Sequence, residues 1–401
     1  MKDAERLYSN RSKEMKASEI REMLKIIQDP EIISFAGGMP SPDSFPYEEI
    51  ERVAKNILRE HGKVALQYGS TEGVIPFRKV IAKMAIKDGI NIDHDNILIT
   101  NGSQQALDMI GKIFLNHGDL AFVGLPTYLA AINAFKPYSK NLVGIPLDEE
   151  GMQVDLLEEK IRELAKKGIT PKFVYVLPTY HNPAGTLMLE KRRKKIIDLA
   201  CEYDLLVIED DPYGKLRYEG DKVKPIKAFD DEEHVLYLGT SSKILCPGFR
   251  LGWSIGPKEI IRKMVIAKQS MDLCTNVFSQ WIACEIFAKE DLLDHHIEEI
   301  IKLYRPRRDA MIKTMKECFP DGYKCTKPQG GLFMWVILPE GIDTKEMLPE
   351  AIKEKVAYIS GKAFNVDGSG ANTMRLNFSY SPEDTIEEGI KRLGRVIEKR
   401  I

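Results

Sequence analysis

Chemically distinctive residues follow several short apolar runs of this 401-residue chain. The run LLVIE leads into Asp210 and Asp211, and the run VLYLG leads into Thr240, Ser242 and Lys243. A lysine at a strand end in an apolar interior has a lowered pKa, which makes its amine a usable nucleophile for a carbonyl group. Taken alone, the sequence SSK also fits a solvated loop. The pattern predicts carbonyl chemistry at Lys243, with a carboxylate at a second strand end.

A second group of residues could hold an anion. Arg250 lies in the otherwise apolar stretch KILCPGFRLGW, where an arginine usually has an anionic partner. The stretch TNGSQQALD predicts a strand end, a glycine turn and a helix that begins near Ser103. The first N–H groups of such a helix bind phosphate, although an ordinary helix cap fits this segment as well. Combined with Thr240 and Arg250, the helix start predicts a phosphate site.

The elements that would position these residues follow from the alternation of apolar runs and helical stretches. Apolar runs occur at 96–100, 120–124, 172–177, 205–210 and 234–239, with helical stretches between them. Strands separated by helices predict a mostly parallel sheet with helices on both faces, which is an α/β fold. In such sheets ligands bind beyond the carboxyl ends of the strands, where the residues named above lie.

The remaining segments predict a smaller α+β domain. Residues 290–401 contain a long charged helical stretch, the strand-like runs GGLFMWVIL and TMRLNFSY, and a closing helix after Pro382. Residues 1–45 contain an amphipathic helix at 18–28 and the run ISFAGGMPSPDSFP. We expect this first segment to cross the cleft as part of the small domain, with residues 46–289 as the large domain that carries the site.

Composition argues against several classes of protein. The 58 Lys and Arg residues nearly balance 60 Asp and Glu, so there is no overall attraction for nucleic acid or for an anionic membrane. The longest apolar run, 332–338, is far shorter than the roughly 20 residues that cross a bilayer, and the charged first residues do not resemble a signal peptide. Six cysteines lack CxxC spacing and seven histidines lack an HExxH pair. We therefore expect reduced thiols, no metal site and a cytoplasmic location.

Eight motifs together resemble the fold-type I aminotransferases that use pyridoxal 5'-phosphate, in the branch that contains 2-aminoadipate and kynurenine aminotransferases. In the family's order they are ISFAGGMPSPDSFP, ALQYGSTEG, TNGSQQALD, PTY, HNPAGT, EDDPY, TSSK followed by PGFRLGW, and MRLNFS. The resemblance covers nearly the whole chain. It implies an aspartate-aminotransferase-like fold, a homodimer with shared active sites, and amino acids and 2-oxo acids as the small-molecule partners.

The same resemblance implies roles for the residues at the reacting end of the cofactor. Lys243 would form the internal Schiff base and then move the proton of the substrate Cα. Asp210 would pair with the protonated pyridine nitrogen and keep the ring an electron sink. Asp211 is the neighbouring alternative, and the DxxY spacing to Tyr213 favours Asp210. Tyr128 of PTY would stack on the ring. A second oxo acid, 2-oxoglutarate, would take up the amine in a ping-pong reaction.

The resemblance also implies the residues that bind the rest of the cofactor and the substrate. Tyr213 and Asn182 would bond the phenolic oxygen of the ring. The phosphate and its surroundings would be held by Ser103, Gln104, Thr240, Ser242, Arg250 and, from the neighbouring subunit, Tyr68. Arg375 in MRLNFS would clamp the substrate α-carboxylate, since its planar fork matches a carboxylate bidentately. Asn182 and Gly38 would lie beside the substrate.

The side chain of the substrate is left open. Arg21, in ASEIREMLK, resembles the arginine that binds the distal carboxylate of a dicarboxylic substrate in 2-aminoadipate aminotransferases. A solvent-facing arginine on a charged helix fits this position equally well. If Arg21 turns inward, glutamate, 2-oxoglutarate and 2-aminoadipate become natural substrates. In this branch the same segment can also admit aromatic, branched or long aliphatic side chains, kynurenine among them.

Three other functions compete with this interpretation. GWSIG matches the GxSxG elbow of serine hydrolases, with Ser254 as nucleophile and Asp272 and His295 following in the right order. The elbow needs a sharp turn, however, whereas GWSIG predicts a continuous strand with Pro257 opening the next helix. Transcription regulators with an aminotransferase-like body need an additional DNA-binding domain, which we do not expect within the first forty residues. A β-lyase or decarboxylase would use the same cofactor for different chemistry.

Overall fold

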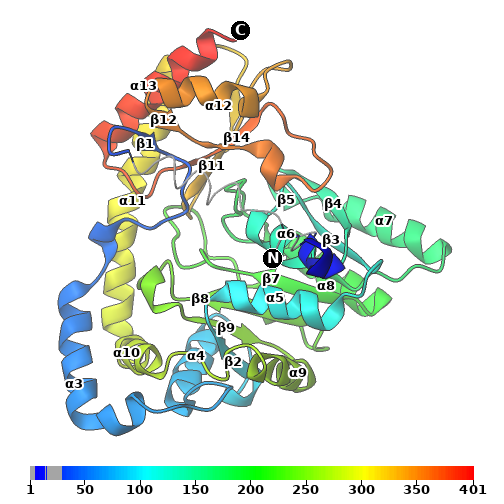
Figure 1. The fold of residues 1–401 in the computed structure, drawn as a ribbon, viewed down its shortest axis with the longest axis vertical. Coiled ribbons are helices and arrows are strands. Elements are labelled where there is room, and N and C mark those ends of the chain that lie inside the picture. Colours follow the sequence, from blue (N-terminus) through cyan, green and yellow to red (C-terminus); the bar gives the residue numbers. More distant parts are fainter. Residues whose placement is uncertain (1–4, 14, 16–28) are drawn as a thin grey trace.

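The computed structural model describes residues 5–13, 15 and 29–401. The helix predicted at 18–28, and Arg21 within it, lie outside the described residues. In Figure 1 a large sheet with its helices occupies the lower part of the molecule, and a smaller part with α12 (Thr344–Lys353) and α13 (Glu383–Glu398) lies above it. Among the described helices, none is long and apolar enough to cross a membrane.

The large sheet has eight strands in the order β2-β9-β8-β7-β6-β3-β4-β5. They are β2 (Ile97–Thr100), β3 (Leu120–Leu125), β4 (Asn141–Asp148), β5 (Gly151–Met152), β6 (Phe173–Val176), β7 (Leu206–Asp210), β8 (Val235–Thr240) and β9 (Gly252–Ile255). The neighbours from β4 to β8 are parallel, whereas β9 is antiparallel to both β8 and β2. All five apolar runs are strands, as predicted. The sequence did not reveal β4, because glycine, proline and exposed residues interrupt its apolar pattern.

Helices cover both faces of this sheet, and the alternation of side chains along each strand explains why both faces are apolar. In β6, Phe173 and Tyr175 pack against one face together with α5 (Ser103–Phe114), α6 (Leu129–Phe135) and α9 (Lys258–Gln269). Val174 and Val176 point to the other face, against α7 (Val154–Lys166) and α8 (Glu190–Tyr203). Near β2 and β9 that second face is covered by α4 (Ile75–Lys87) and α10 (Val277–Phe287), and α3 (Tyr47–Ala65) packs on α10.

The smaller part is built from chain segments at both ends of the sequence. Its antiparallel sheet has the order β10 (Lys324–Cys325), β11 (Phe333–Ile337), β14 (Thr373–Asn377) and β13 (Ile359–Ser360). A separate pair joins β1 (Ile33–Ser34) to β12 (Val356–Ala357) in parallel, so the segment before residue 45 lies against the C-terminal part. The long helix α11 (Glu290–Cys318) runs from α10 to α13 and connects the two parts (Figure 1). Short helices include α1 (Asn10–Lys13).

Candidate active site

Strand register brings the phosphate-binding candidates to one edge of the large sheet. Thr100 at the end of β2 pairs with Gly252 at the start of β9, and Gly252 pairs in turn with Thr240 at the end of β8. Because β9 runs in the opposite direction to its neighbours, its first residue lies where β2 and β8 end. Arg250, just before β9, therefore reaches the loop after β2, and its guanidinium packs directly on Gly102.

Glycine is required at two positions of this edge. A Cβ on Gly252 would lie 2.6 Å from backbone atoms of Gly102 and Ser103, and a Cβ on Gly102 would lie 2.5 Å from the Arg250 guanidinium. Gly102 also has a φ of +71°, which disfavours other residues. The missing side chains allow β9, the Arg250 side chain and the start of α5 to approach one another closely.

The polar groups at this edge fit a phosphate. Ser103 opens α5 as predicted, and no described side chain caps that helix start. Arg250 is exposed, and no described carboxylate lies within ion-pair distance of its guanidinium. Thr240 and Ser242 are buried and share a hydrogen bond of 2.9 Å between their hydroxyls. Gln104 is exposed beside them on α5, 3.4 Å from the carbonyl of Ala130. A helix start without a described cap, next to a guanidinium without a described carboxylate partner, could bind an anion.

Lys243 lies in the loop after β8, and its ammonium group points toward the N-terminal segment. Its Nζ donates a 2.9 Å hydrogen bond to the carbonyl of Gly38. Burial, together with the positive charges of Arg250 and Arg375, lowers the pKa of Lys243 to about 8. The lowered pKa that the sequence suggested is thus present. It leaves a larger fraction of neutral amine near neutral pH than an exposed lysine would have.

Asp210 ends β7 as a buried carboxylate with one unused oxygen. Its Oδ2 accepts a 2.6 Å hydrogen bond from the hydroxyl of Tyr175 on the neighbouring strand β6, while Oδ1 has no partner among the described residues. Burial raises the pKa of Asp210 to about 7. A buried oxygen without a donor is costly, and a bound N–H cation would satisfy it. The protonated pyridine nitrogen of pyridoxal phosphate is such a group.

Asp211 has different partners, because neighbouring residues at a strand end point to opposite sides. Its Oδ1 accepts a 2.9 Å hydrogen bond from the backbone N–H of Gly214, and its Oδ2 accepts one of 3.2 Å from Tyr237. The side chain lines a separate cavity of about 60 Å³ that Asp88 and Lys215 also line. Both Asp211 oxygens are therefore occupied on the side of the strand away from Tyr175.

Arg375 in β14 is a buried cation without a carboxylate. It is 1% exposed, and no described carboxylate lies within ion-pair distance. Its Nη1 donates to the Asn182 side chain at 3.0 Å and its Nη2 to the carbonyl of Ala36 at 2.6 Å. The guanidinium also lies over the rings of Phe333 and Phe364, at 4.2 and 5.0 Å from the ring centres. Burial lowers the pKa of Arg375 to about 10, and an anionic ligand would restore its charge balance.

The remaining ring-binding candidates meet between Arg375 and Asp210. Asn182 donates a long hydrogen bond of 3.5 Å to the hydroxyl of Tyr213, which is buried. Burial and the neighbouring Tyr128 raise the pKa of Tyr213, so it stays a neutral hydrogen-bond donor. Tyr128 is the residue directly before α6, and it lies close to Tyr175 and Tyr213. Amide, phenol and carboxylate groups therefore lie close to one another and to the two cations Lys243 and Arg375.

Three predicted site residues remain to be placed: Tyr68, Gly38 and Arg21. Tyr68 follows α3 and is 79% exposed, with its side chain outside the site of its own chain. Gly38 borders the site through its carbonyl, and a Cβ there would lie 3.2 Å from the ring of Phe333. Arg21 lies outside the described residues.

The serine hydrolase alternative is wrong. Ser254 lies in the middle of β9, fully buried, paired with Leu98 on one side and Leu238 on the other. Its hydroxyl has no hydrogen-bond partner among the described residues, so it has no base. The predicted acid, Asp272, instead accepts hydrogen bonds from Lys268.

Tyr175 is a residue of this site that the sequence analysis did not single out. It appeared only as one letter of the apolar run at 172–177. The available signal was its hydroxyl, because a tyrosine within a fully buried strand needs a hydrogen-bond partner beneath the surface. The two aromatic rings around Arg375, Phe333 and Phe364, were missed for the same reason: they belong to segments that look like ordinary core.

The mostly parallel sheet has the aspartate-aminotransferase-like fold, with Lys243, the buried Asp210 and the candidate phosphate-binding groups at its carboxyl edge. The chain belongs to the aminotransferase class I and II family, whose model matches residues 31–393. It is therefore an aminotransferase that uses pyridoxal phosphate as its cofactor.

Similar proteins place it in one branch of that family. The aromatic-amino-acid aminotransferase 1 of Thermococcus litoralis is 54% identical over all of this chain and 96% of its own length. The structure of a Pyrococcus horikoshii kynurenine aminotransferase, in complex with PMP, matches with a TM-score of 0.96 and 53% identity over 100% of this chain and 98% of that one. The structure of the α-aminoadipate aminotransferase LysN of Thermus thermophilus, complexed with N-(5'-phosphopyridoxyl)-L-leucine, matches with a TM-score of 0.91 and 35% identity. The match covers 99% of this chain and 98% of that one.

Proposed function

We propose that this enzyme transfers the amino group of an α-amino acid to a 2-oxo acid, with 2-oxoglutarate as acceptor, in a ping-pong reaction through Lys243. The observation that carries the proposal is the buried Arg375, which lacks a described carboxylate partner and lies at the same site as Lys243. A guanidinium there would bind the α-carboxylate that every amino acid and every 2-oxo acid presents. Both half-reactions would use the same clamp.

The cofactor would be bound at three places. Ser103, Thr240 and Arg250 would hold its phosphate, with Gln104 and Ser242 beside them. Asp210 would bind the ring nitrogen, since its Oδ1 has no donor in the part of the chain that the structure describes. Tyr213 and Asn182 would bond the phenolic oxygen and Tyr128 would stack on the ring. Bound pyridoxal phosphate supplies an electron sink that stabilises negative charge at the substrate Cα.

Lys243 would carry the proton in both directions. Its amine would attach to the cofactor and, once displaced by the substrate, would accept the proton from Cα as a neutral base. A pKa of about 8 supports this role, because the amine is both basic and partly unprotonated near neutral pH. The carbonyl of Gly38, which now accepts from Nζ, would help to hold the freed amine on the substrate side.

The amino donor would come from the range of substrates named for the relatives. These names are aromatic amino acids, kynurenine and α-aminoadipate. We propose that Arg21 determines the dicarboxylic part of this range. The variant Arg21→Ala should then lose activity with 2-aminoadipate and glutamate and retain activity with aromatic amino acids. Equal losses with both kinds of substrate would assign Arg21 to a solvent-facing position instead.

We also propose that the active enzyme is a homodimer in which Tyr68 reaches the cofactor phosphate of the partner subunit. Apolar side chains that are exposed in the single chain lie near this tyrosine in the sequence: Val64 at 58%, Leu66 at 70% and Ile75 at 50%. The domain division at residues 46 and 290 and the cytoplasmic location stay predictions.

An absorption spectrum of the purified enzyme tests the reaction directly. The band of the lysine-bound cofactor should bleach when glutamate is added and return when 2-oxoglutarate is added. Lys243→Ala should lose the band and the turnover while keeping the fold, as measured by circular dichroism. Lys215→Ala is a matched control, since Lys215 pairs with Asp88 outside the site. Release of ammonia from an amino acid with a β leaving group, with the band retained in the absence of any oxo acid, would assign the enzyme to elimination chemistry.

A further inference from the structure

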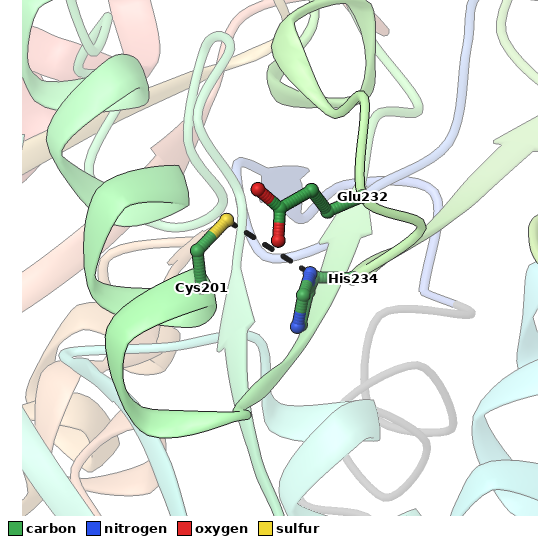
Figure 2. A group of neighbouring side chains, drawn as sticks. All are labelled: Cys201, Glu232 and His234. Atoms are coloured by element: carbon green, nitrogen blue, oxygen red, sulfur yellow. Dashed lines mark hydrogen bonds between the residues drawn. The ribbon is translucent and has the colours of Figure 1, made fainter.

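Three potential metal ligands of different chemistry meet at a place remote from the active site. Cys201 lies near the end of α8, and Glu232 and His234 lie in the turn that leads into β8, so the group joins two elements (Figure 2). One ligand atom of each residue lies within 4.8 Å of the other two. Sγ of Cys201 is 3.9 Å from Nδ1 of His234, a weak hydrogen bond at best.

The turn that carries two of these residues is held in place by Asp230. Its Oδ1 accepts a 2.8 Å hydrogen bond from the backbone N–H of His234, and its Oδ2 accepts one from Val235 at 2.8 Å. The ammonium group of Lys227 pairs with the same carboxylate at 2.6 Å. His234 and Glu232 are thus presented by a backbone that is already fixed, which lowers the cost of assembling a site.

The two ring nitrogens of His234 face different neighbours. Its Nε2 lies 3.6 Å from Oδ1 of the exposed Asp204, just beyond hydrogen-bond distance, while Nδ1 faces Cys201. Histidines that bind a metal through one ring nitrogen commonly direct the other N–H to a carboxylate, which selects the tautomer with a free lone pair at the metal.

We propose that Cys201, Glu232 and His234 bind a divalent transition metal, with Zn²⁺ as the best match. Thiolate, imidazole and carboxylate are the three ligand types that zinc uses in proteins, and a water molecule would complete a tetrahedral shell at this half-exposed place. Binding would replace the thiol proton, which is released to solvent, by a Zn–S bond. The sequence analysis expected no metal site, because the three ligands come together only through the fold.

The site would act as a clamp between α8 and the start of β8. Six residues of β8 separate His234 from the carboxyl edge that carries Lys243, roughly 20 Å along an extended strand. We therefore expect the metal to stabilise the fold and to leave the chemistry of the active site unchanged.

A second group of possible ligands, Asp93, His94 and Asp95, lacks these properties. The three residues are consecutive in one exposed turn. Asp93 caps that turn and pairs with Lys258 at 3.1 Å, and Asp95 pairs with Arg78 at 3.6 Å. Its carboxylates are already engaged, so we propose no site there.

Titration of the chelator-treated holoenzyme with Zn²⁺ against a chromophoric chelator tests the proposal. We expect one Zn²⁺ per chain in the wild type, with affinity falling at least about tenfold in Cys201→Ser and in His234→Gln, and about tenfold in Asp204→Asn. Cys318→Ser is the matched control, a half-buried cysteine outside the group, and should bind as the wild type does. Co²⁺ should give visible d–d bands in the wild type and lose them in Cys201→Ser.

Thermal unfolding provides a second measurement that does not depend on activity. Zn²⁺ should raise the midpoint of the wild type and of Cys318→Ser, and leave that of Cys201→Ser unchanged. Equal affinity in the wild type and all of the variants, or the same Zn²⁺ effect on every midpoint, would show that Zn²⁺ does not bind through Cys201 and His234 and would overturn the proposal.

Discussion

Two neighbouring carboxylates at the end of β7, Asp210 and Asp211, have different hydrogen-bond partners although they are the same chemical group. One oxygen of Asp210 accepts a hydrogen bond from the Tyr175 hydroxyl, and the other has no donor among the described residues. Asp211 is engaged by Gly214 and Tyr237 on the other side of the strand. The same chemical group is therefore free to bind a cofactor at one position and occupied in the protein at the next.

This difference predicts unequal effects of matched substitutions. Asp210→Asn should lower kcat at least about 100-fold, since breaking a buried charge pair costs about 3–5 kcal/mol. Asp211→Asn should lower it far less and act mainly on stability. Steady-state kinetics together with thermal unfolding of both variants measure the contrast. If Asp211→Asn proved the inactive one, the assignment of the ring partner would have to be reversed.

Tyr175 is predicted to position and tune Asp210 without touching the substrate. Its hydrogen bond lowers the pKa of Asp210 against the raising effect of burial. Tyr175→Phe should therefore raise that pKa, so that the charged carboxylate is present only at higher pH. We expect the acid limb of the kcat profile to move to higher pH and kcat to fall about tenfold, which corresponds to about 1.4 kcal/mol.

The KM for the amino donor separates this role from a purely structural one. Tyr175→Phe should leave KM nearly unchanged, because Arg375 and its contacts are not altered. Phe135→Leu provides a comparison, since Phe135 packs edge-on against the Tyr175 ring at 5.6 Å without reaching Asp210. A pH profile that moved equally in both variants would contradict the tuning role.

At the scale of elements, the reversed strand β9 organises the anion site. Antiparallel pairing places its first residue, Gly252, between Thr100 and Thr240. The residues just before the strand can then meet the start of α5, which follows β2. A parallel strand at this position would bring its last residue to that edge and leave Arg250 at the opposite end of the sheet.

Gly252→Ala is predicted to disturb this junction. The added Cβ would overlap backbone atoms of Gly102 and Ser103 at 2.6 Å, so the start of α5 must shift. We expect a loss of about 1–3 kcal/mol in unfolding free energy and weaker binding of pyridoxal phosphate. Gly248→Ala is the matched control, because a Cβ there meets nothing within 4 Å. Equal cofactor affinity in both variants, measured by equilibrium dialysis, would show that the junction tolerates the methyl group.

At the scale of the whole molecule, the exposed apolar surface around Tyr68 is the feature that a single chain leaves unexplained. Large exposed apolar patches mark interaction surfaces, and Tyr68 has the exposed Val64, Leu66 and Ile75 near it in the sequence. Since Tyr68 points away from the site of its own chain, a second copy is the partner that would give this residue a function.

Leu66→Glu tests the surface. Placing a charge in an apolar interface should shift the enzyme toward monomers and weaken cofactor binding, because each site would lose the Tyr68 of its partner. Light scattering after gel filtration measures the mass of the particle, and the visible spectrum measures the cofactor. Ile169→Glu changes a similarly apolar residue, 43% exposed after α7, and should leave both unchanged. A wild-type enzyme that is monomeric would contradict the shared site.

The sequence by itself determined the large elements and the sheet edge at which most of the candidate site residues lie. Strands that are buried on both faces appear as continuous apolar runs, and the residues after these runs fall at one sheet edge by the geometry of parallel strands. For this reason the positions of Lys243, the Asp210–Asp211 pair and the start of α5 at one sheet edge were predictable from local pattern, whereas the choice of Asp210 over Asp211 rested on the family resemblance.

Only the tertiary structure decided which groups from distant segments meet. The partner of Asp210 comes from β6, the rings around Arg375 come from β11 and the loop after β13, and the carbonyl that holds Lys243 comes from the N-terminal segment. The group of Cys201, Glu232 and His234 arises in the same way. Such contacts depend on strand order and register, which the apolar pattern of a single segment does not encode.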